Sequence, residues 1–101
     1  MGGKIDITWK VNTAVTEHAA IAISGSSQST TAMGAQTYAV RLCSTGACHY
    51  LISSKGAAAT ANSAYLPANV AEIVSCAPGD IVSVIRDGAA TGNFIATEMT
   101  H

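Results

Sequence analysis

Two cysteines and a histidine stand close together in the stretch RLCSTGACHY, which covers residues 41–50. Thiol and imidazole groups at this spacing could bind a metal ion, and a cysteine beside a histidine could act as a nucleophile with its base. Two thiols could also form a disulfide. The whole chain has only three cysteines, Cys43, Cys48 and Cys76. Which of these alternatives holds decides whether the protein carries out chemistry.

A zinc site would require Cys43, Cys48, His49 and Cys76 to converge on one ion. The spacing does not match a standard zinc knuckle, and neighbouring residues 48 and 49 point to opposite faces of a strand. The same alternation separates a Cys48 thiol from a His49 imidazole, and no local motif marks an Asn or Asp partner for them. We therefore expect no metal site, no catalytic residues and no cofactor.

A disulfide between Cys43 and Cys48 is geometrically accessible, because both residues flank the predicted turn at 44–47. The odd number of cysteines leaves Cys76 without a partner, however. The first residues also lack the uninterrupted apolar segment of a secretion signal. We therefore expect three free thiols that pack as small apolar groups, in a protein made in a reducing cytoplasm.

The carboxylates are scattered, and no pattern makes two of them converge as a glycosidase pair requires. Asp80 and Asp87 occupy turn positions, where an Asp side chain commonly accepts a hydrogen bond from its own backbone. His18 and His101 are predicted to be solvated. No Gly-rich stretch follows a strand and opens a helix, as a phosphate-binding loop does. The six acidic residues are Asp6, Glu17, Glu72, Asp80, Asp87 and Glu98.

Alternation of apolar and polar residues with period two predicts β-strands along most of the chain. Residues 24–31 are all small and polar and predict a surface loop. Residues 55–62 are Ala-rich, but flanking Gly, Thr and Asn favour a loop over a helix. The predicted strands cover residues 4–11, 19–23, 37–43, 48–52, 70–76, 81–86 and 93–99.

Turn signals separate these strands at intervals of about 8 to 12 residues, as in sandwiches and barrels. Residues 77–80, APGD, predict a type II turn because Pro fixes φ at its first central position and Gly accepts positive φ at its second. Residues 44–47 and 87–92 predict hairpin loops. The predicted fold is all-β, an antiparallel β-sandwich or small jelly roll or barrel of seven to eight short strands. It forms a single domain over residues 1–101 with a short N-terminal arm.

Charged residues make up 11% of the chain, against roughly 25% in soluble domains, and the net charge is −1. A surface with so few charges favours association, so we expect the protein to bind further copies of the chain or a partner. Five Lys and Arg residues without a cluster exclude nucleic acid as the partner. The apolar runs are far shorter than the ~20 residues of a membrane helix, so we expect no membrane contact.

The segments AYLPAN at 64–69, PGD at 78–80, DGA at 87–89 and ATEMTH at 96–101 resemble short virion-associated proteins of tailed bacteriophages. The similarity extends over roughly residues 29–101. It implies a β-sandwich component of the virion, a capsid decoration or cement protein that binds the major capsid protein or other virion proteins. The resemblance transfers no catalytic residue. We expect a homo-oligomer, for which a trimer is one arrangement, with contacts through Gly2–Lys4 and Ser24–Thr31.

Two alternatives remain open at this point. One is a tail or head-to-tail accessory protein that takes part in host recognition. The other is a small carbohydrate-binding module, which usually exposes aromatic side chains as platforms. Trp9 and the three tyrosines are predicted to face mostly inward, which disfavours that function. The tyrosines are Tyr38, Tyr50 and Tyr65.

Overall fold

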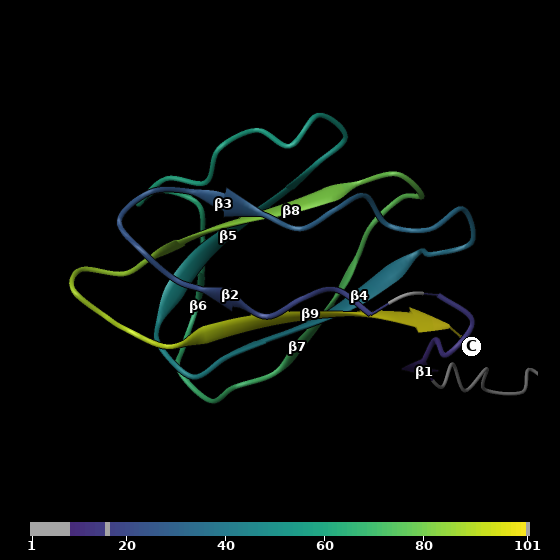
Figure 1. The fold of residues 1–101 in the computed structure, drawn as a ribbon, viewed down its shortest axis with the longest axis horizontal. Coiled ribbons are helices and arrows are strands. Elements are labelled where there is room, and N and C mark those ends of the chain that lie inside the picture. Colours follow the sequence, from purple (N-terminus) through teal and green to yellow (C-terminus); the bar gives the residue numbers. More distant parts are fainter. Residues whose placement is uncertain (1–8, 16, 101) are drawn as a thin grey trace, which may run out of the picture.

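The computed structural model describes residues 9–15 and 17–100, which form nine strands in two antiparallel sheets (Figure 1). The predicted all-β sandwich is confirmed, and the structure adds two short strands, Gln28–Ser29 and Ala64–Leu66, that the sequence did not predict. No helix among the described residues could cross a membrane. The strands are β1 (Lys10–Val11), β2 (Ile21–Ala22), β3 (Gln28–Ser29), β4 (Ala39–Ser44), β5 (Cys48–Ser53), β6 (Ala64–Leu66), β7 (Glu72–Ser75), β8 (Ile81–Arg86) and β9 (Asn93–Thr100).

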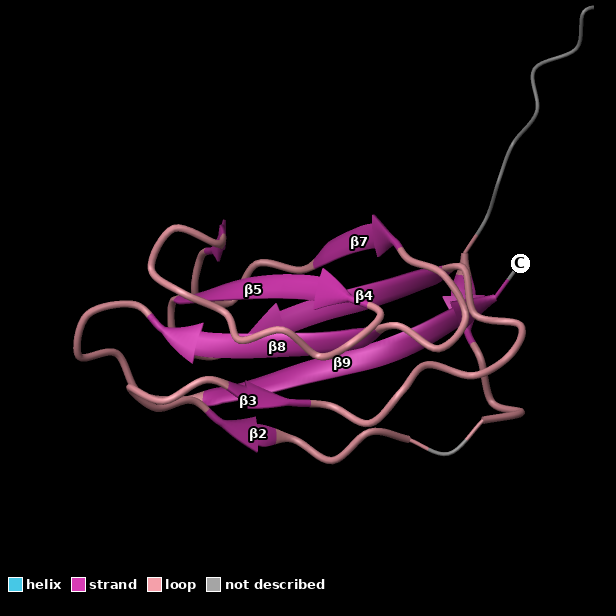
Figure 2. Ribbon diagram, turned by 90° about the horizontal axis from the view of Figure 1, so that it is seen from above, coloured by secondary structure: helices cyan, strands magenta, loops and turns pink. Residues whose placement is uncertain are grey.

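The strand order is that of a jelly roll, in which the chain passes repeatedly from one sheet to the other. Sheet A has the order β1-β9-β4-β7, and β2 also pairs with β9. Sheet B has the order β3-β8-β5-β6. Because β1 pairs with the end of β9 and β2 with its beginning, the two act as one interrupted edge strand. Figure 1 shows the two sheets as layers, with β3 and β8 above β2 and β9, and Figure 2 looks down on them so that the strands of the two sheets overlap.

Both predicted hairpins are wrong, because each of these turns connects the two sheets. Residues 44–47 join β4 of sheet A to β5 of sheet B, and residues 87–92 join β8 of sheet B to β9 of sheet A. β4 has β9 and β7 on its two edges, and β5 has β8 and β6. Neither strand therefore has an edge left for its neighbour in sequence. A turn signal locates a chain reversal but does not specify which strands then pair.

The turn at residues 77–80 has the predicted type II geometry. Gly79 has a φ of 87°, and the Asp80 N–H donates to the carbonyl of Ala77 at 3.0 Å. The Asp80 carboxylate accepts a hydrogen bond from the Ala77 N–H at 2.9 Å, as expected for Asp in a turn. This turn also crosses between the sheets, since β7 and β8 belong to different layers.

The core lies between the sheets and consists mostly of aliphatic side chains. Phe94 of β9 is its largest fully buried side chain. In β4 and β9, alternate residues point inward, which is the period that the sequence shows. The buried core cluster comprises Ile23, Met33, Val40, Leu42, Cys48, Leu66, Val82, Val84, Phe94 and Ala96.

Several local predictions differ from the structure. β3 lies inside the stretch predicted as a loop, because its Ser29 pairs with Ser83 of β8 and the two hydroxyl groups hydrogen bond at 3.2 Å. Tyr38 and Tyr65 were predicted inward but are 56% and 50% exposed. Tyr38 precedes the first residue of β4, and Tyr65 lies on an edge strand. Residues 55–62 contain no helix, as predicted. The arm Gly2–Lys4 and His101 lie outside the described residues.

Candidate functional site

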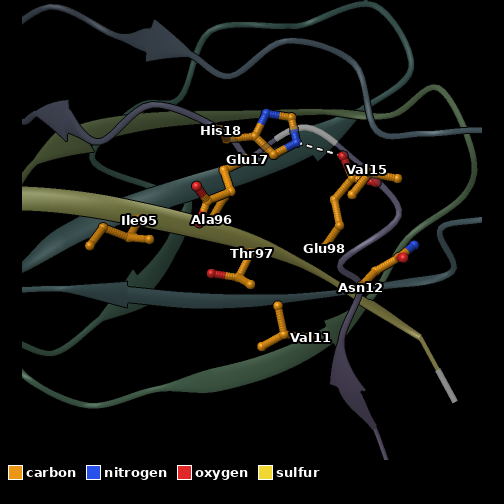
Figure 3. A pocket seen from close by; sticks show the side chains of 9 residues that line it. All are labelled: Val11, Asn12, Val15, Glu17, His18, Ile95, Ala96, Thr97 and Glu98. Carbon is orange, nitrogen blue, oxygen red and sulfur yellow. Dashed lines mark hydrogen bonds and ion pairs between the residues drawn. The ribbon is translucent and has the colours of Figure 1, made fainter.

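A small cavity of about 70 Å³ lies between the connection from β1 to β2 and the middle of β9 (Figure 3). It forms where the interrupted edge strand leaves β9, because β1 and β2 pair only with the ends of that strand. The cavity is lined by Val11, Asn12, Val15, Glu17, His18, Ile95, Ala96, Thr97 and Glu98.

Glu98 is buried on the inward face of β9 and accepts three hydrogen bonds. Its Oε1 accepts from the Gly34 N–H at 2.9 Å and from the hydroxyl group of Thr37. Its Oε2 lies 2.8 Å from Nε2 of His18. Burial alone would raise the pKa of this carboxyl, but the hydrogen bonds from Thr37, Gly34 and His18 outweigh burial and lower the pKa. Glu98 is therefore held as a carboxylate.

His18 was predicted to be solvated, but its side chain is only 4% exposed. Besides Glu98, it contacts the Thr31 hydroxyl through Nδ1 at 3.1 Å. A hydroxyl group can donate, so a neutral ring satisfies both contacts, with Nε2–H donating to Glu98 and Nδ1 accepting from Thr31. The sequence gives no signal for this cluster, because its members come from three separate segments.

Glu17 lines the same cavity, so the structure brings together two carboxylates that appear scattered in the sequence. A glycosidase acid needs a raised pKa and a proton to donate, whereas the Glu98 carboxyl has a lowered pKa and engages both of its oxygens. The cluster instead works as a clamp. It fastens the β1–β2 connection and the segment 31–37 to β9.

A second histidine, His49 of β5, lies on the outer side of sheet B. Its Nδ1 is 3.0 Å from the Ser63 carbonyl oxygen and its Nε2 is 2.9 Å from Oδ1 of Asp87. A carbonyl and a carboxylate only accept, so both contacts are satisfied as hydrogen bonds at once when both ring nitrogens carry a proton, as in the imidazolium form. The hydrogen bond to Asp87, followed by that to Ser63, raises the pKa of His49. With both nitrogens donating, the ring has no site left to accept a proton as a base.

The contact between His49 and Asp87 was missed because Asp87 is itself a turn residue, and its carboxylate was expected to bond its own backbone. Its backbone carbonyl does accept from the Ala90 N–H at 3.0 Å, as a turn residue would. Its carboxylate, however, reaches His49, since the pairing of β5 with β8 places His49 opposite Ile85, two residues earlier. Only knowledge of that pairing could have indicated the contact.

The three cysteines are free and lie in separate environments. Cys48 is fully buried in the core, and burial raises the pKa of its thiol. Burial, with the charges of Asp80 and Glu98, raises the pKa of Cys76 to about 11. Cys43 sits opposite Ile95 in sheet A. Within residues 9–15 and 17–100, no three His, Cys, Asp or Glu side chains gather as a metal site would need.

The outer side of sheet A carries a group of exposed aliphatic side chains, which we call the apolar face. Val11, Ile73 and Ile95 are 54%, 47% and 45% exposed. Residues directly opposite each other in a sheet share a face, so Ile73 lies beside Arg41. Ile95 lies beside Cys43, two residues along β4 from Arg41, and so on the same face. Arg41 is the single charged residue at these positions of β4 and β9. The apolar face is therefore nearly neutral and solvent-accessible.

Comparison with known proteins identified no relative: no family model, no curated protein and no solved structure matches the chain.

Proposed function

We propose that this chain is a structural protein of a bacteriophage particle, a capsid decoration protein that stabilises the head shell by binding the major capsid protein. The observation that carries the proposal is the apolar face of sheet A, in a chain with 11% charged residues. Burial of exposed aliphatic surface contributes about 25 cal/mol per Å². The side chains of Val11, Ile73 and Ile95 lie on one face of the sheet and are open to solvent, so a partner that covers sheet A would bury all three.

The apolar face suits a repeated, individually weak contact. Val11, Ile73 and Ile95 are held on a sheet whose other side is the packed core, so docking orders few side chains. Each copy would bury a modest area, and repetition over a lattice would multiply the effect. Arg41 among apolar neighbours would pair best with a carboxylate on the partner.

The segment 24–31, which the sequence suggested as a contact, is fastened within the sandwich. Gln28 Nε2 donates to the Ala22 carbonyl oxygen at 3.0 Å, and the Thr30 N–H donates to the Val82 carbonyl oxygen at 2.9 Å. A fastened segment cannot drape over a neighbour as a free arm would. We therefore place the proposed contact on the apolar face.

The test begins with the copy number of this chain in purified particles, measured by quantitative mass spectrometry. Hundreds of copies support a decoration protein, whereas a dozen or fewer assign the chain to the tail. Particles with and without the chain are then heated, and release of packaged DNA is followed by dye fluorescence. A protein that binds the intact lattice raises its release temperature by mass action. Identical release curves would overturn the assignment to the shell.

The variant Ile95→Lys tests the surface itself. It places a charge at the centre of the apolar face without touching the core, since Ile95 is 45% exposed. Particles lacking the chain should bind the wild type but not this variant in a sedimentation assay. A matched control, Lys55→Glu, changes a charge on the β5–β6 loop in sheet B and should bind normally.

A carbohydrate-binding module is the second candidate, because Tyr65 is exposed and not inward as the sequence suggested. Its ring lies 5.4 Å from that of His49, and the Asp87 side chain is 49% exposed beside it. An exposed ring next to a carboxylate could stack on a sugar and accept its hydroxyl groups. Binding on a glycan array that Tyr65→Ala abolishes would favour this function over a shell contact.

A further inference from the structure

The four edges of the sandwich differ in how well they are protected against strand pairing. Exposed edges present unpaired N–H and C=O groups, and proteins usually blunt them with short strands, bulges, Lys or Pro. The edges formed by β1, β2 and β3 consist of two-residue strands, and β6 has three residues. β7 is the longest edge strand, and its sequence, Glu-Ile-Val-Ser, contains neither Lys nor Pro. No described strand lies beyond it (Figure 2).

The hydrogen-bond pattern identifies which groups β7 leaves open. The Cys76 N–H donates to the Tyr38 carbonyl oxygen at 3.0 Å, so the backbone of Cys76 points toward the strand that contains β4. Bonded and non-bonded pairs alternate in an antiparallel ladder, so Val74, opposite Val40, also points its backbone groups toward β4. The N–H and C=O groups of Ile73 and Ser75 must then point away from the sheet.

The side chains of β7 favour pairing at this edge. Ile73 is 47% exposed and would be covered by an added strand. The one charge of β7, the Glu72 carboxylate, accepts a hydrogen bond from the Tyr50 hydroxyl at 3.0 Å and is held toward sheet B. Pairing beyond Ser75 is stopped because the Ala77 N–H already donates to Asp80.

We propose that β7 pairs with β7 of a second copy of this chain, in antiparallel orientation about a two-fold axis at Val74. In this register, Ile73 of each copy lies opposite Ser75 of the other copy. The contact therefore contains two hydrogen-bonded residue pairs, one on each side of the two-fold axis. These pairs supply about four N–H···O bonds. Val74 then lies opposite its own copy and loses its remaining exposure. The two A sheets join into one continuous sheet.

The charges permit this joint. Arg41 is the nearest cation on the outer side, one strand inside β7. The two Arg41 residues would be separated by three strand spacings, about 14 Å at 4.8 Å each, which exceeds the Debye length of ~8 Å at physiological salt. The two Arg41 charges are therefore screened from each other across the joint. A two-fold contact predicts pairs of chains, whereas composition alone suggested a trimer as one arrangement.

The pairing concerns the isolated chain and does not depend on a location in a virion. It is tested by measuring the mass of the purified chain by analytical ultracentrifugation at protein concentrations from about 10 µM to 1 mM, the range in which a contact of this small size should form. We expect the weight-average mass to rise from one chain to two. Ser75→Pro removes only an N–H that points away from β4, so it should stay at the mass of one chain and keep the wild-type melting temperature when dilute.

Two lysine variants locate the contact without proline. Ile73→Lys should prevent pairing, whereas Ile95→Lys, equally exposed but two strands away from the edge, should associate as the wild type does. A wild type that stays at one chain throughout would overturn the proposal. Association lost in Ile95→Lys but kept in Ser75→Pro would also overturn it, because the contact would then lie on the apolar face.

Discussion

Replacement of Glu98 tests whether its hydrogen bonds stabilise the folded protein, as the clamp requires, or whether the buried charge contributes nothing to stability. Glu98→Leu removes the acceptor but leaves its three donors without a partner, namely the Thr37 hydroxyl, the Gly34 N–H and the His18 Nε2–H. A buried donor without a partner costs about 1–3 kcal/mol, so the three of them together should cost about 3 kcal/mol or more. Replacing every member of a buried polar cluster by apolar groups can be stabilising, but here only the acceptor is replaced and its donors stay. The penalty should therefore dominate.

Glu98→Gln provides the matched variant, because its volume and one acceptor oxygen are kept. The new amide N–H can donate to Nε2 of His18 if the ring proton moves to Nδ1 and donates to the Thr31 hydroxyl. The geometry thus survives, and only the charge assistance of the hydrogen bonds is lost. We expect a loss of about 1–2 kcal/mol for this variant.

Urea unfolding followed by tryptophan fluorescence measures both variants, with pH as a second axis. The pKa of Glu98 is lowered on folding, so its contribution is present above the ordinary glutamate pKa and disappears as pH falls through the folded pKa. The wild type should lose stability with acid more steeply than Glu98→Gln. If Glu98→Leu stays within about 0.5 kcal/mol of the wild type, as ordinary surface changes do, the clamp contributes nothing.

Three further measurements follow from the structure. The pKa of His49 is raised, so its contribution is present below the ordinary histidine pKa and should fade as pH rises through the folded value; Asp87→Asn should flatten this dependence in urea melts, and an unchanged slope would contradict the ion pair. Denatured chain without reductant should titrate three thiols, whereas in the native state Cys48 and Cys76 should alkylate slowly because their pKa values are raised; a single thiol would reveal a disulfide. Gly79→Val should cost about 1–2 kcal/mol, because a Cβ there meets open space and only the positive φ opposes it; full stability would refute the type II turn.

Strands with strong local patterns could be predicted closely from the sequence. The predicted strand 81–86 coincides with β8, and 93–99 falls one residue short of β9. β8 is rich in β-branched residues, and its Val82 and Val84 are buried, while β9 alternates and buries Phe94 and Ala96. β3 could not be predicted in this way, because its Gln28 and Ser29 are polar and their strand geometry is imposed by β8.

The clamp and the imidazolium could not be predicted, because both depend on strand pairing between distant segments. His18 reaches Glu98 only after β2 and β9 have paired, and His49 reaches Asp87 only after β5 and β8 have paired. The apolar face has the same origin. Ile73 and Ile95 are unremarkable in their own strands and become neighbours in a patch only through β4, which lies between β7 and β9.

The edge contact and the apolar face are connected through Ile73, which belongs to both. Residues paired across the joint share a face, so the two apolar faces of a dimer point to the same side and form one surface of double length. Such a dimer is a bivalent ligand for a repeating lattice, since the second contact occurs at an effective concentration in the ~mM range. Ser75→Pro leaves the side chains of the apolar face intact but should lower affinity for particles at least tenfold, while Ile95→Lys weakens each single contact. Equal affinity of Ser75→Pro and wild type, with pairing of the free chain confirmed, would mean that the dimer binds through one face at a time.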